Sequence, residues 1–452
     1  MNLLINDTIV AIATPIGEGA ISVIRLSGED SFRVVDLIFK GKMKISFAAS
    51  HTIHYGKIVD EKGVIIDDVL ISVFRGPNSY TGEDSVEIST HGNSIITKKI
   101  LELLLSKNVR SAEPGEFTKR AFLNNKIDLS QAEAVLDLIK SRTDSALRGA
   151  RNQLDGMLSQ KINVLRQSLL NASSLIELEL DFSEEGYEFI PKDEIIEKID
   201  KVLKEIDYLL DSYRFGKVLK DGINLAIIGE PNVGKSSLLN YILKEARAIV
   251  SDIPGTTRDI IREEISIDGV LFKIFDTAGI RKSEDLIEIE GVKRSLEAVK
   301  NADIILWLTD IKNDYSESIK KELDKYTDPK KIIKVVNKID LSENVEIVAD
   351  VYISSKTGQG INSLFEEMKK HAVGEGVYTE KSTVINNVRH YNALKRTAEF
   401  LDTAKISIIQ EMSGEFIAVD LRNAVDSLSE IIGIVTTDDI LNNIFDKFCI
   451  GK

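Results

Sequence analysis

The stretch DGINLAIIGEPNVGKSSLLNYIL, residues 221–243, decides the fold of the central part of the chain. Its apolar run 225–228 predicts a buried strand, and the spacing of the apolar residues behind it predicts a helix. Between them, residues 229–236 match GxxxxGKS, a loop whose backbone N–H groups surround phosphates while Lys235 reaches the β/γ oxygens. Ser236 is placed to ligate Mg²⁺. We therefore predict a P-loop that binds a nucleoside triphosphate.

Two further motifs follow in the order that a Ras-like GTPase requires. SDIPGTTRD offers Thr257, with Thr256 beside it, as a second hydroxyl ligand of Mg²⁺. In DTAG, Asp276 can hold Mg²⁺ through water and the Gly279 N–H can sense the γ-phosphate. Ras-like GTPases continue with a glutamine that orients the attacking water, but Ile280 stands here. Some other polar residue, or a cation, must supply the missing catalysis.

Two more motifs indicate that the base is guanine. In Asn337-Lys338-Ile339-Asp340, the Asp340 carboxylate accepts both donors of guanine's Watson–Crick edge, where adenine presents an acceptor. The segment ISSKTGQG then supplies a loop that supports the base. The nucleotide-binding residues predicted from all these motifs are Asn232, Val233, Gly234, Lys235, Ser236, Ser237, Ser251, Asp252, Ile253, Pro254, Gly255, Thr256, Thr257, Asp276, Thr277, Ala278, Gly279, Asn337, Lys338, Asp340, Ser354, Ser355 and Lys356.

The composition limits the class of protein. A chain of 452 residues predicts roughly two to four domains. Its formal net charge of −14 repels polyanions, so binding of nucleic acid requires a local basic patch or a helper protein. A single cysteine cannot form an internal disulfide, the N-terminus has no basic leader, and no apolar run is long enough to span a membrane. We therefore expect a cytoplasmic protein without a membrane span.

The rest of the chain divides into an α/β part and a helical part. Residues 1–118 alternate strand-like runs (8–13, 20–26, 69–74 and 85–89) with two amphipathic helices (31–39 and 94–106). From residue 130 the pattern is helical, beginning with a capping box, Ser130-x-x-Glu133. Two apolar stripes at helical spacing are expected in the core: Leu129, Ala132, Val135, Leu136 and Ile139, and Ile417, Leu421, Val425, Leu428 and Ile432.

Helical stretches lie on both sides of the nucleotide-binding segment. They reach about residue 215 and resume after residue 378. Since the ends of a compact domain often lie close together, a GTPase domain of residues 217–376 can be inserted into one helical domain made of residues 119–216 and 377–452. Residues 217–222 and 374–376 are the expected hinges. The predicted fold is an N-terminal α/β domain, a discontinuous all-α domain and an inserted Ras-like P-loop GTPase domain.

The motifs together resemble the tRNA-modification GTPase family MnmE, also called TrmE. The resemblance covers the whole chain through DTIVAIATPIGEGAISVIRLSG, PNSYTGEDSVEISTHG, EPGEFTKRAFLNNKIDLSQAEAVLDLI, the GTPase motifs and the C-terminal CIGK. It implies that a K⁺ ion held by Asn232, Ser251, Ile253 and Thr256 replaces an arginine finger. It also implies that Glu288 positions water, although Glu284 and Glu290 lie close by, and that Arg281 stabilises the switch.

The resemblance also assigns a second ligand to the N-terminal domain. The family binds a tetrahydrofolate derivative there, 5-formyl- or methylene-tetrahydrofolate, and dimerises through the same domain. The matching residues are Arg25, Glu87, Lys126 and Lys452. Cys449 stands in the terminal motif, either as a site residue whose reactivity is open or as a buried structural cysteine. Prenylation is excluded, because Gly451 and Lys452 do not fit that motif.

The function that the resemblance implies is a K⁺-stimulated GTPase that acts in tRNA wobble-uridine modification. The family works as a homodimer with the flavoprotein MnmG (GidA), in a heterotetramer or larger complex. Together they build an aminomethyl or carboxymethylaminomethyl group on carbon 5, with FAD belonging to the partner. Two alternatives remain: a ribosome-assembly GTPase, although no KH domain or second GTPase domain is visible, and a dynamin-like membrane GTPase, although no lipid-binding segment is visible.

Overall fold

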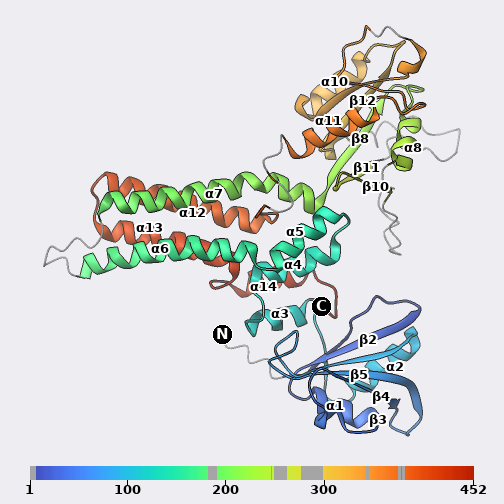
Figure 1. Cartoon of the computed structure of the whole chain (residues 1–452), viewed down its shortest axis with the longest axis vertical. Helices are drawn as coiled ribbons and strands as arrows, with labels where there is room; N and C mark the ends of the chain where they lie inside the picture. The colour runs from blue at the N-terminus through green and yellow to red at the C-terminus, as the bar shows by residue number, and fades with distance from the viewer. Residues whose placement is uncertain are drawn as a thin grey trace. The chain divides into compact units, whose positions relative to one another are not determined.

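The structure is a computed structural model that describes residues 7–181, 191–245, 247–248, 262–275, 299–342, 346–374, 378 and 382–452. The chain forms two compact units (Figure 1). The first contains Met1–Leu136 and Ser429–Lys452, and the second contains Asp137–Leu428. The division into residues 1–118, 119–216, 217–376 and 377–452 stays a prediction. Within the described residues, no helix has both the length and the apolar character needed to cross a membrane.

A seven-stranded sheet forms the centre of the first unit. In spatial order its strands are β3 (Phe39–Gly41), β4 (Thr52–Val59), β5 (Ile65–Phe74), β6 (Ser85–Gly92), β2 (Gly19–Ser27), β1 (Ile9–Ile12) and β7 (Arg110–Ser111). All neighbours are antiparallel except β1 and β7. Helices α1 (Ser31–Ile38) and α2 (Ser94–Leu105) pack their apolar residues into the same core as the strands. The predicted strands and helices are confirmed, while β3, β4 and β7 have no predicted counterpart.

Helices α3 (Glu116–Leu123) and α14 (Asp438–Phe445) also belong to the first unit, together with the start of α4 (Leu129–Lys140). The start of α4 and the C-terminal segment share a small core with Leu129, Ala132, Phe445 and Phe448. Helix α14 begins after Thr437, whose Oγ1 accepts a bond from the Ile440 N–H. The C-terminal segment of the chain therefore packs in the same unit as the N-terminal residues.

The capping box of α4 lies two residues before the predicted one. Asp128 Oδ1 accepts the Gln131 N–H at 2.9 Å, and Gln131 Oε1 accepts the Asp128 N–H at 2.9 Å. These reciprocal bonds satisfy N–H groups that a helix start leaves open. The predicted box of Ser130 and Glu133 is wrong, because Ser130 already lies inside the helix. Of the first predicted stripe, Ile139 is exposed.

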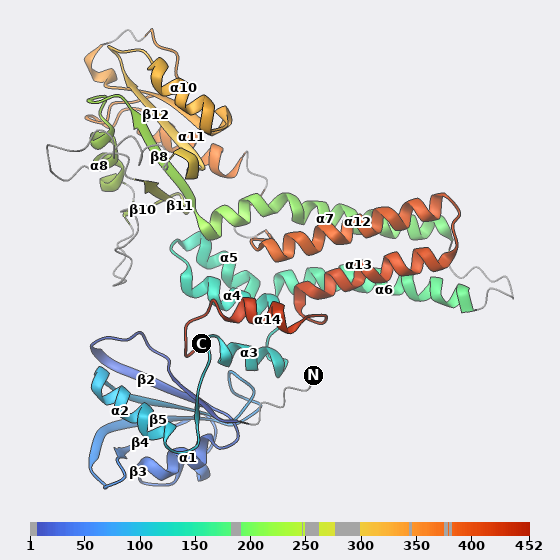
Figure 2. The same ribbon diagram turned by 180° about the vertical axis from the view of Figure 1, so that it is seen from behind.

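Long helices dominate one part of the second unit. They are α5 (Asp144–Leu154), α6 (Met157–Asp181), α7 (Lys192–Asp221), α12 (Val388–Ile409) and α13 (Gly414–Ile432). Figures 1 and 2 both show α7 and α12 side by side. The apolar stripe of α13 is buried as predicted. The expected hinge at residues 217–222 is corrected: α7 continues to Asp221, and Gly222, with a φ of 74°, ends it.

The second sheet carries the GTPase motifs. Its spatial order is β14 (Val351–Tyr352), β13 (Ile332–Asn337), β12 (Ile304–Asp310), β8 (Ile223–Gly229), β11 (Val270–Phe275), β10 (Arg262–Ile267) and β9 (Arg247–Ala248). The strands from β14 to β11 are parallel, while β10 is antiparallel to both of its neighbours. Helices α8 (Lys235–Glu245) and α11 (Ile361–Val373) pack on one face and α10 (Glu317–Tyr326) on the other. This is the predicted Ras-like α/β arrangement.

Candidate functional site

The P-loop lies between β8 and α8, as the sequence predicts. Three of its residues have a positive φ: Gly229 (153°), Asn232 (65°) and Gly234 (100°). At Gly234 a side chain has no room, because a Cβ would collide with the Asn337 side-chain amide. Glycine at this position lets the loop pass directly over the end of β13, where the guanine motif begins.

Lys235 lies over the loop that precedes it. Its Nζ donates to the carbonyl oxygens of Gly229 and Glu230, both at 2.8 Å. Burial lowers the pKa of the Lys235 ammonium, because a low dielectric disfavours the charged form. A phosphate at the loop offers this ammonium an anionic acceptor, so the position fits the role predicted for Lys235.

Asn337 connects the P-loop to the base-supporting loop. It ends β13 with a fully buried side chain, whose Nδ2 donates to the Val233 carbonyl at 2.9 Å. Its Oδ1 accepts the Ser355 N–H at 3.0 Å and the Ser355 hydroxyl at 2.9 Å. Both Nδ2 and Oδ1 of the Asn337 amide are therefore hydrogen bonded to protein atoms. Asn337 thus acts by holding two loops together.

Asp340 and Ser354 form the part of the site predicted to read guanine. Ser354 is buried, and its hydroxyl donates to Asp340 Oδ1 at 2.7 Å. This bond orients the carboxylate, and the Asp340 side chain is exposed. The adjacent Lys356 is exposed as well. The arrangement leaves the Asp340 carboxylate accessible to a base that offers two donors.

The structure adds one residue to the predicted site, Asp310. Lys338 Nζ donates to Asp310 Oδ2 at 2.9 Å and to the Asn232 carbonyl at 2.6 Å, so it links β12 to the P-loop. Burial alone would raise the pKa of the Asp310 carboxyl, but hydrogen bonds from Lys338 and from the Lys312 N–H hold it below its usual value. The signal in the sequence was a Thr-Asp pair that ends the apolar run 304–308 at the same sheet edge.

Part of the predicted site lies outside the described residues. This applies to both switch segments with the predicted Mg²⁺ and K⁺ ligands, and to the two residues predicted to assist hydrolysis. They are Ser251, Asp252, Ile253, Pro254, Gly255, Thr256, Thr257, Asp276, Thr277, Ala278, Gly279, Arg281 and Glu288. Of the predicted cation ligands, Asn232 and Ser236 are described; Asn232 is exposed on the loop and Ser236 is exposed in the first turn of α8.

The predicted folate residues Arg25 and Glu87 meet in the first unit. They face each other across β2 and β6, and the Arg25 guanidinium donates to Glu87 Oε1 through Nε at 2.9 Å and an Nη at 2.7 Å. The guanidinium also lies 5.7 Å from the ring centroids of Tyr80 and Phe117. Neither ring was predicted, because no motif marks an aromatic residue as a neighbour of a distant strand.

The other two predicted folate residues lie elsewhere on the same unit. Lys126 Nζ donates to the Pro77 carbonyl at 2.9 Å. The segment before Lys452 runs along β1, because Gly451, with a φ of 96°, packs so closely on the Ile12 carbonyl that a Cβ would collide with it. Among the described residues, no hydrogen bond or ion pair joins Lys126 or Lys452 to Arg25 or Glu87.

Cys449 is exposed, which rules out a buried structural cysteine. Helix α14 ends at Phe445, so Cys449 lies beyond the apolar face that buries Leu441 and Ile444. Its carbonyl accepts the Gly115 N–H at 3.5 Å and the Lys452 N–H at 3.3 Å. The backbone of the tail is therefore held, while the thiol is accessible.

Comparisons with known proteins agree over the whole chain. The family model described as MnmE helical domain matches residues 129–449, and the model described as GTP-binding protein TrmE N-terminus matches residues 8–126. The chain is 45% identical over 461 residues to the tRNA modification GTPase MnmE of Clostridioides difficile, with 100% of both chains covered. It is 44% identical over 474 residues to the protein of the same name from Christiangramia forsetii, with 99% of this chain and 100% of that protein covered.

Solved structures also resemble parts of the chain. Era from Aquifex aeolicus bound to GDP·AlF4⁻ is 25% identical and covers 39% of this chain and 65% of its own, with a TM-score of 0.26. A TM-score this low carries no argument about function.

Proposed function

Because this chain belongs to the MnmE family of tRNA modification GTPases, we propose that it hydrolyses GTP and acts in the modification of the tRNA wobble uridine. The observation that carries the GTPase part is the bond network of Asn337, which joins the P-loop at Val233 to the base loop at Ser355. The tRNA part rests on relatives that are similar over their full length.

In this proposal two kinds of cation assist hydrolysis. Ser236 and Thr257 would hold Mg²⁺, and Asn232, Ser251, Ile253 and Thr256 would hold K⁺. Bound there, the cations neutralise charge that develops between the β- and γ-phosphates. The described part of the donor set fits, because Asn232 is exposed on the loop and Ser236 is exposed in the first turn of α8. Glu288 positions water, and Arg281 stabilises the switch.

The first unit binds a tetrahydrofolate derivative in the same proposal. The Glu87 carboxylate can accept from the donor edge of a pterin and the Arg25 guanidinium can donate to its acceptor edge, and Tyr80 beside Arg25 is 41% exposed. Lys126 and Lys452 suit the acidic part of a folate. The exposed thiol of Cys449 supports a role at this site over a role in packing.

We also propose partners and a location for this chain. The chain forms a homodimer and works with the flavoprotein MnmG, which brings FAD, to attach an aminomethyl or carboxymethylaminomethyl group at carbon 5. The location is the cytoplasm, where a chain with a single cysteine needs no disulfide.

The decisive experiment is mass spectrometry of wobble nucleosides in tRNA from cells that lack this gene. We expect the modified uridine to disappear, to return with the intact chain and to stay absent with Lys235→Ala. Complementation with Cys449→Ser then tests the thiol, since full restoration would reduce Cys449 to a residue without chemical function. Unchanged nucleosides in the cells without the gene would overturn the modification proposal and favour a ribosome-assembly GTPase, which GTP-dependent co-sedimentation with ribosomes would test.

A further inference from the structure

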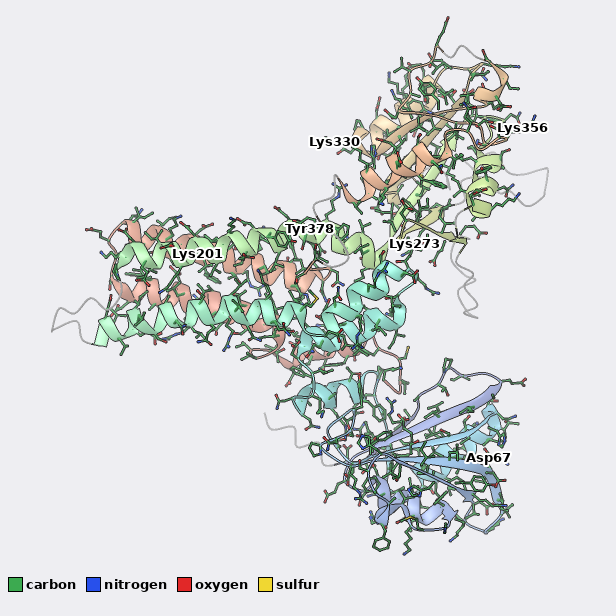
Figure 3. All side chains as sticks on the ribbon, viewed as in Figure 1. Asp67, Lys201, Lys273, Lys330, Lys356 and Tyr378 are labelled. Atoms are coloured by element: carbon green, nitrogen blue, oxygen red, sulfur yellow. The ribbon has the colours of Figure 1, made fainter. Side chains whose placement is uncertain are left out.

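A hollow of about 370 Å³ lies in the second unit, at the edge of the GTPase sheet opposite the nucleotide site. Its walls are the last turns of α7, the segments before β12 and β13, and the end of α11. The parallel strands β8, β12 and β13 begin at this edge, whereas the P-loop and Asn337 stand where β8 and β13 end. Figure 3 shows Lys330 and the base-loop residue Lys356 on opposite sides of this part. The hollow is therefore separate from the nucleotide site.

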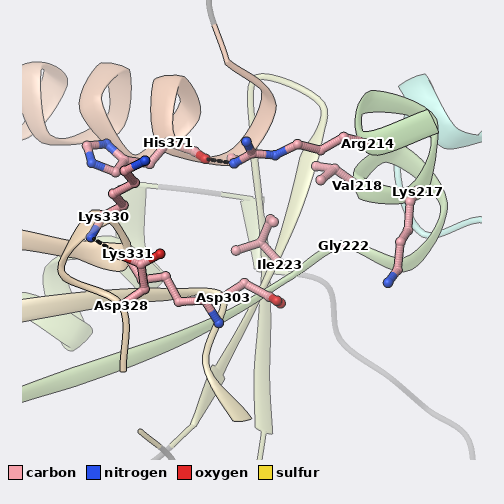
Figure 4. Close-up of a pocket in the computed structure, with 11 residues that line it drawn as sticks. Arg214, Lys217, Val218, Gly222, Ile223, Asp303, Asp328, Lys330, Lys331 and His371 are labelled. Atoms are coloured by element: carbon pink, nitrogen blue, oxygen red, sulfur yellow. Dashed lines mark hydrogen bonds between the residues drawn. The ribbon is translucent and has the colours of Figure 1, made fainter. Parts of the chain in front are cut away.

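Cationic side chains outnumber carboxylates around this hollow, which we call the α7 pocket. Figure 4 shows α7 supplying cations on one side and the segment before β13 supplying cations on the other. The charged lining residues are Arg214, Lys217, Lys330 and Lys331 with the carboxylates Asp303 and Asp328. A positive excess at this place contrasts with the net charge of −14 of the whole chain.

The two carboxylates are bound to backbone groups of the pocket wall. Asp303 Oδ2 accepts the Asn224 N–H at 2.9 Å, and Asp328 Oδ1 accepts the Lys330 N–H at 2.9 Å. In the part of the chain that the structure describes, neither forms an ion pair with a lysine or arginine. They shape the wall and leave the cations of the pocket without a direct counter-charge.

Two of the four cationic side chains are hydrogen bonded to backbone carbonyl groups of the pocket wall. The Arg214 guanidinium donates to the His371 carbonyl at 2.9 Å, and Lys331 Nζ donates to the Ala302 carbonyl at 3.2 Å. Lys217 and Lys330 are exposed, and over the described ranges their ammonium groups make no hydrogen bond or ion pair. These two ammonium groups, on opposite walls, are available to a ligand.

We propose that the α7 pocket binds phosphate groups of the tRNA backbone through Lys217 and Lys330. This inference rests on the proposed tRNA substrate and says where the chain holds it. An acidic chain repels RNA at a distance, so contact requires a place where cations gather. Lysine ammonium groups bind phosphate oxygens as point charges and release counterions from the RNA, which makes the affinity dependent on salt.

The test compares two double variants with the same change of charge. Lys217→Glu with Lys330→Glu reverses the pocket, while Lys204→Glu with Lys321→Glu reverses exposed lysines of α7 and α10 outside it. Affinity for unmodified tRNA is measured by fluorescence anisotropy over a series of salt concentrations. We expect the pocket variant to bind at least about tenfold more weakly, with a slope of log affinity against log salt that is smaller by about two. The tRNA affinity of the control variant should change by less than about threefold.

Several results would overturn the inference. Equal weakening in both variants would assign the effect to net charge alone, and unchanged binding by the pocket variant would remove its role. A pocket variant that loses affinity for tripolyphosphate but keeps tRNA would indicate a small phosphate ligand in place of RNA. Absence of tRNA binding by the unmutated chain would also overturn it, while the nucleoside measurement judges the proposed function separately. GTP affinity that is unchanged in both double variants shows that they are folded. The double variant Lys217→Gln with Lys330→Gln repeats the test without adding negative charge.

Discussion

Asn337 is hydrogen bonded to Val233 across the nucleotide site, with Nδ2 donating to the carbonyl oxygen at 2.9 Å. The same amide accepts two bonds from Ser355, so one buried side chain holds the P-loop and the base loop together. Gly234 makes this approach possible, since a Cβ there would collide with Nδ2. The site is thus built around an asparagine that faces protein atoms, and its geometry depends on that residue.

Replacing Asn337 by Ala should therefore weaken both the fold and nucleotide binding. The change leaves the Val233 carbonyl and the Ser355 N–H without their partner in a buried place, and each unsatisfied group costs about 1–3 kcal/mol. We expect the free energy of unfolding to fall by about 2–4 kcal/mol and GTP affinity to fall at least about tenfold. Urea unfolding and nucleotide titration measure the two effects. Asn240→Ala on the exposed face of α8 is the control, and wild-type GTP affinity in Asn337→Ala would contradict the argument.

Asp340→Asn should move the base preference from guanine towards xanthine. The carboxylate accepts two donors of guanine, whereas an asparagine amide offers a donor that xanthine's extra carbonyl can accept. Since bonds to a charged group contribute about 1.5–3 kcal/mol, we expect GTP affinity to fall by about 10- to 100-fold and XTP affinity to rise. Ser354→Ala removes only the hydroxyl that orients Asp340, so its loss should be smaller. A variant that still prefers GTP over XTP would contradict the assignment of Asp340.

The sequence predicted the parts of the site that depend on local pattern. The P-loop unit, the strand that ends at Asn337 and the loop at Ser354 and Ser355 all follow from short motifs next to apolar runs. Asp310 was missed because its role depends on β12 lying between β8 and β13, and strand order is a property of the whole sheet. Its own neighbours in sequence carry no nucleotide-binding motif.

One wrong prediction and one open alternative have local causes. Asp128-x-x-Gln131 and Ser130-x-x-Glu133 both have the spacing of a capping box, and only the observed start of α4 separates them. The sequence left open whether Cys449 is buried or part of a site, and the structure decides for exposure, because α14 ends at Phe445 and Cys449 lies beyond it. A pattern therefore predicts that a helix exists better than it predicts where the helix begins and ends.

His91 should titrate above the ordinary histidine range. Its Nδ1 lies 2.6 Å from Asp67 Oδ1, and this hydrogen bond, followed by the charge of the carboxylate, raises the pKa of His91 above 6.5. Because the folded-state pKa is raised, the pair stabilises the fold fully below pH 6.5, and this stabilisation is lost as the pH rises through the folded-state pKa. Asp67→Asn keeps an acceptor for the His91 N–H but removes the charge.

NMR titration of the His91 ring measures this prediction directly. We expect the His91 pKa to return towards 6.5 in Asp67→Asn, and the stability difference between the two proteins to be larger at pH 6 than at pH 9. Asp68→Asn, which changes the next residue and its pair with Lys57, is the comparison: the Asp68 charge also raises the His91 pKa, but less than Asp67 does, so the pKa should fall less in this variant. A His91 pKa at or below 6.5 in the unmutated protein would show that Asp67 does not raise it.

Glu87→Gln should lower folate affinity and leave GTP affinity unchanged. The substitution keeps the shape of the side chain but removes the charge that Arg25 binds and that the proposal assigns to a pterin's donors. Loss of one charge-assisted bond predicts a fall of about 10- to 100-fold in affinity for 5-formyl-tetrahydrofolate, measured by calorimetry. Asp68→Asn alters an exposed ion pair on the same sheet and should bind normally. Equal folate affinity in Glu87→Gln and the unmutated protein would remove Glu87 from the site.

Asn232→Gly should remove the preference for K⁺ over Na⁺ in GTP hydrolysis. Asn232 has a φ of 65°, so Ala would add backbone strain, whereas Gly adopts this conformation freely and removes only the amide. The Asn232 carbonyl that accepts Lys338 Nζ is retained in the variant. We expect the ratio of the hydrolysis rates in K⁺ and Na⁺ to fall to about one while GTP affinity stays within about threefold.

The control for this prediction is the unmutated protein in the two salts at equal ionic strength. Asn232→Ala provides a second comparison, because strain should lower its GTP affinity more than Asn232→Gly does, with the same loss of ion preference. If the unmutated protein hydrolyses GTP equally fast in both salts, the proposal that K⁺ assists hydrolysis is wrong. If it prefers K⁺ and Asn232→Gly keeps that preference, a cation still assists, but Asn232 is not its ligand.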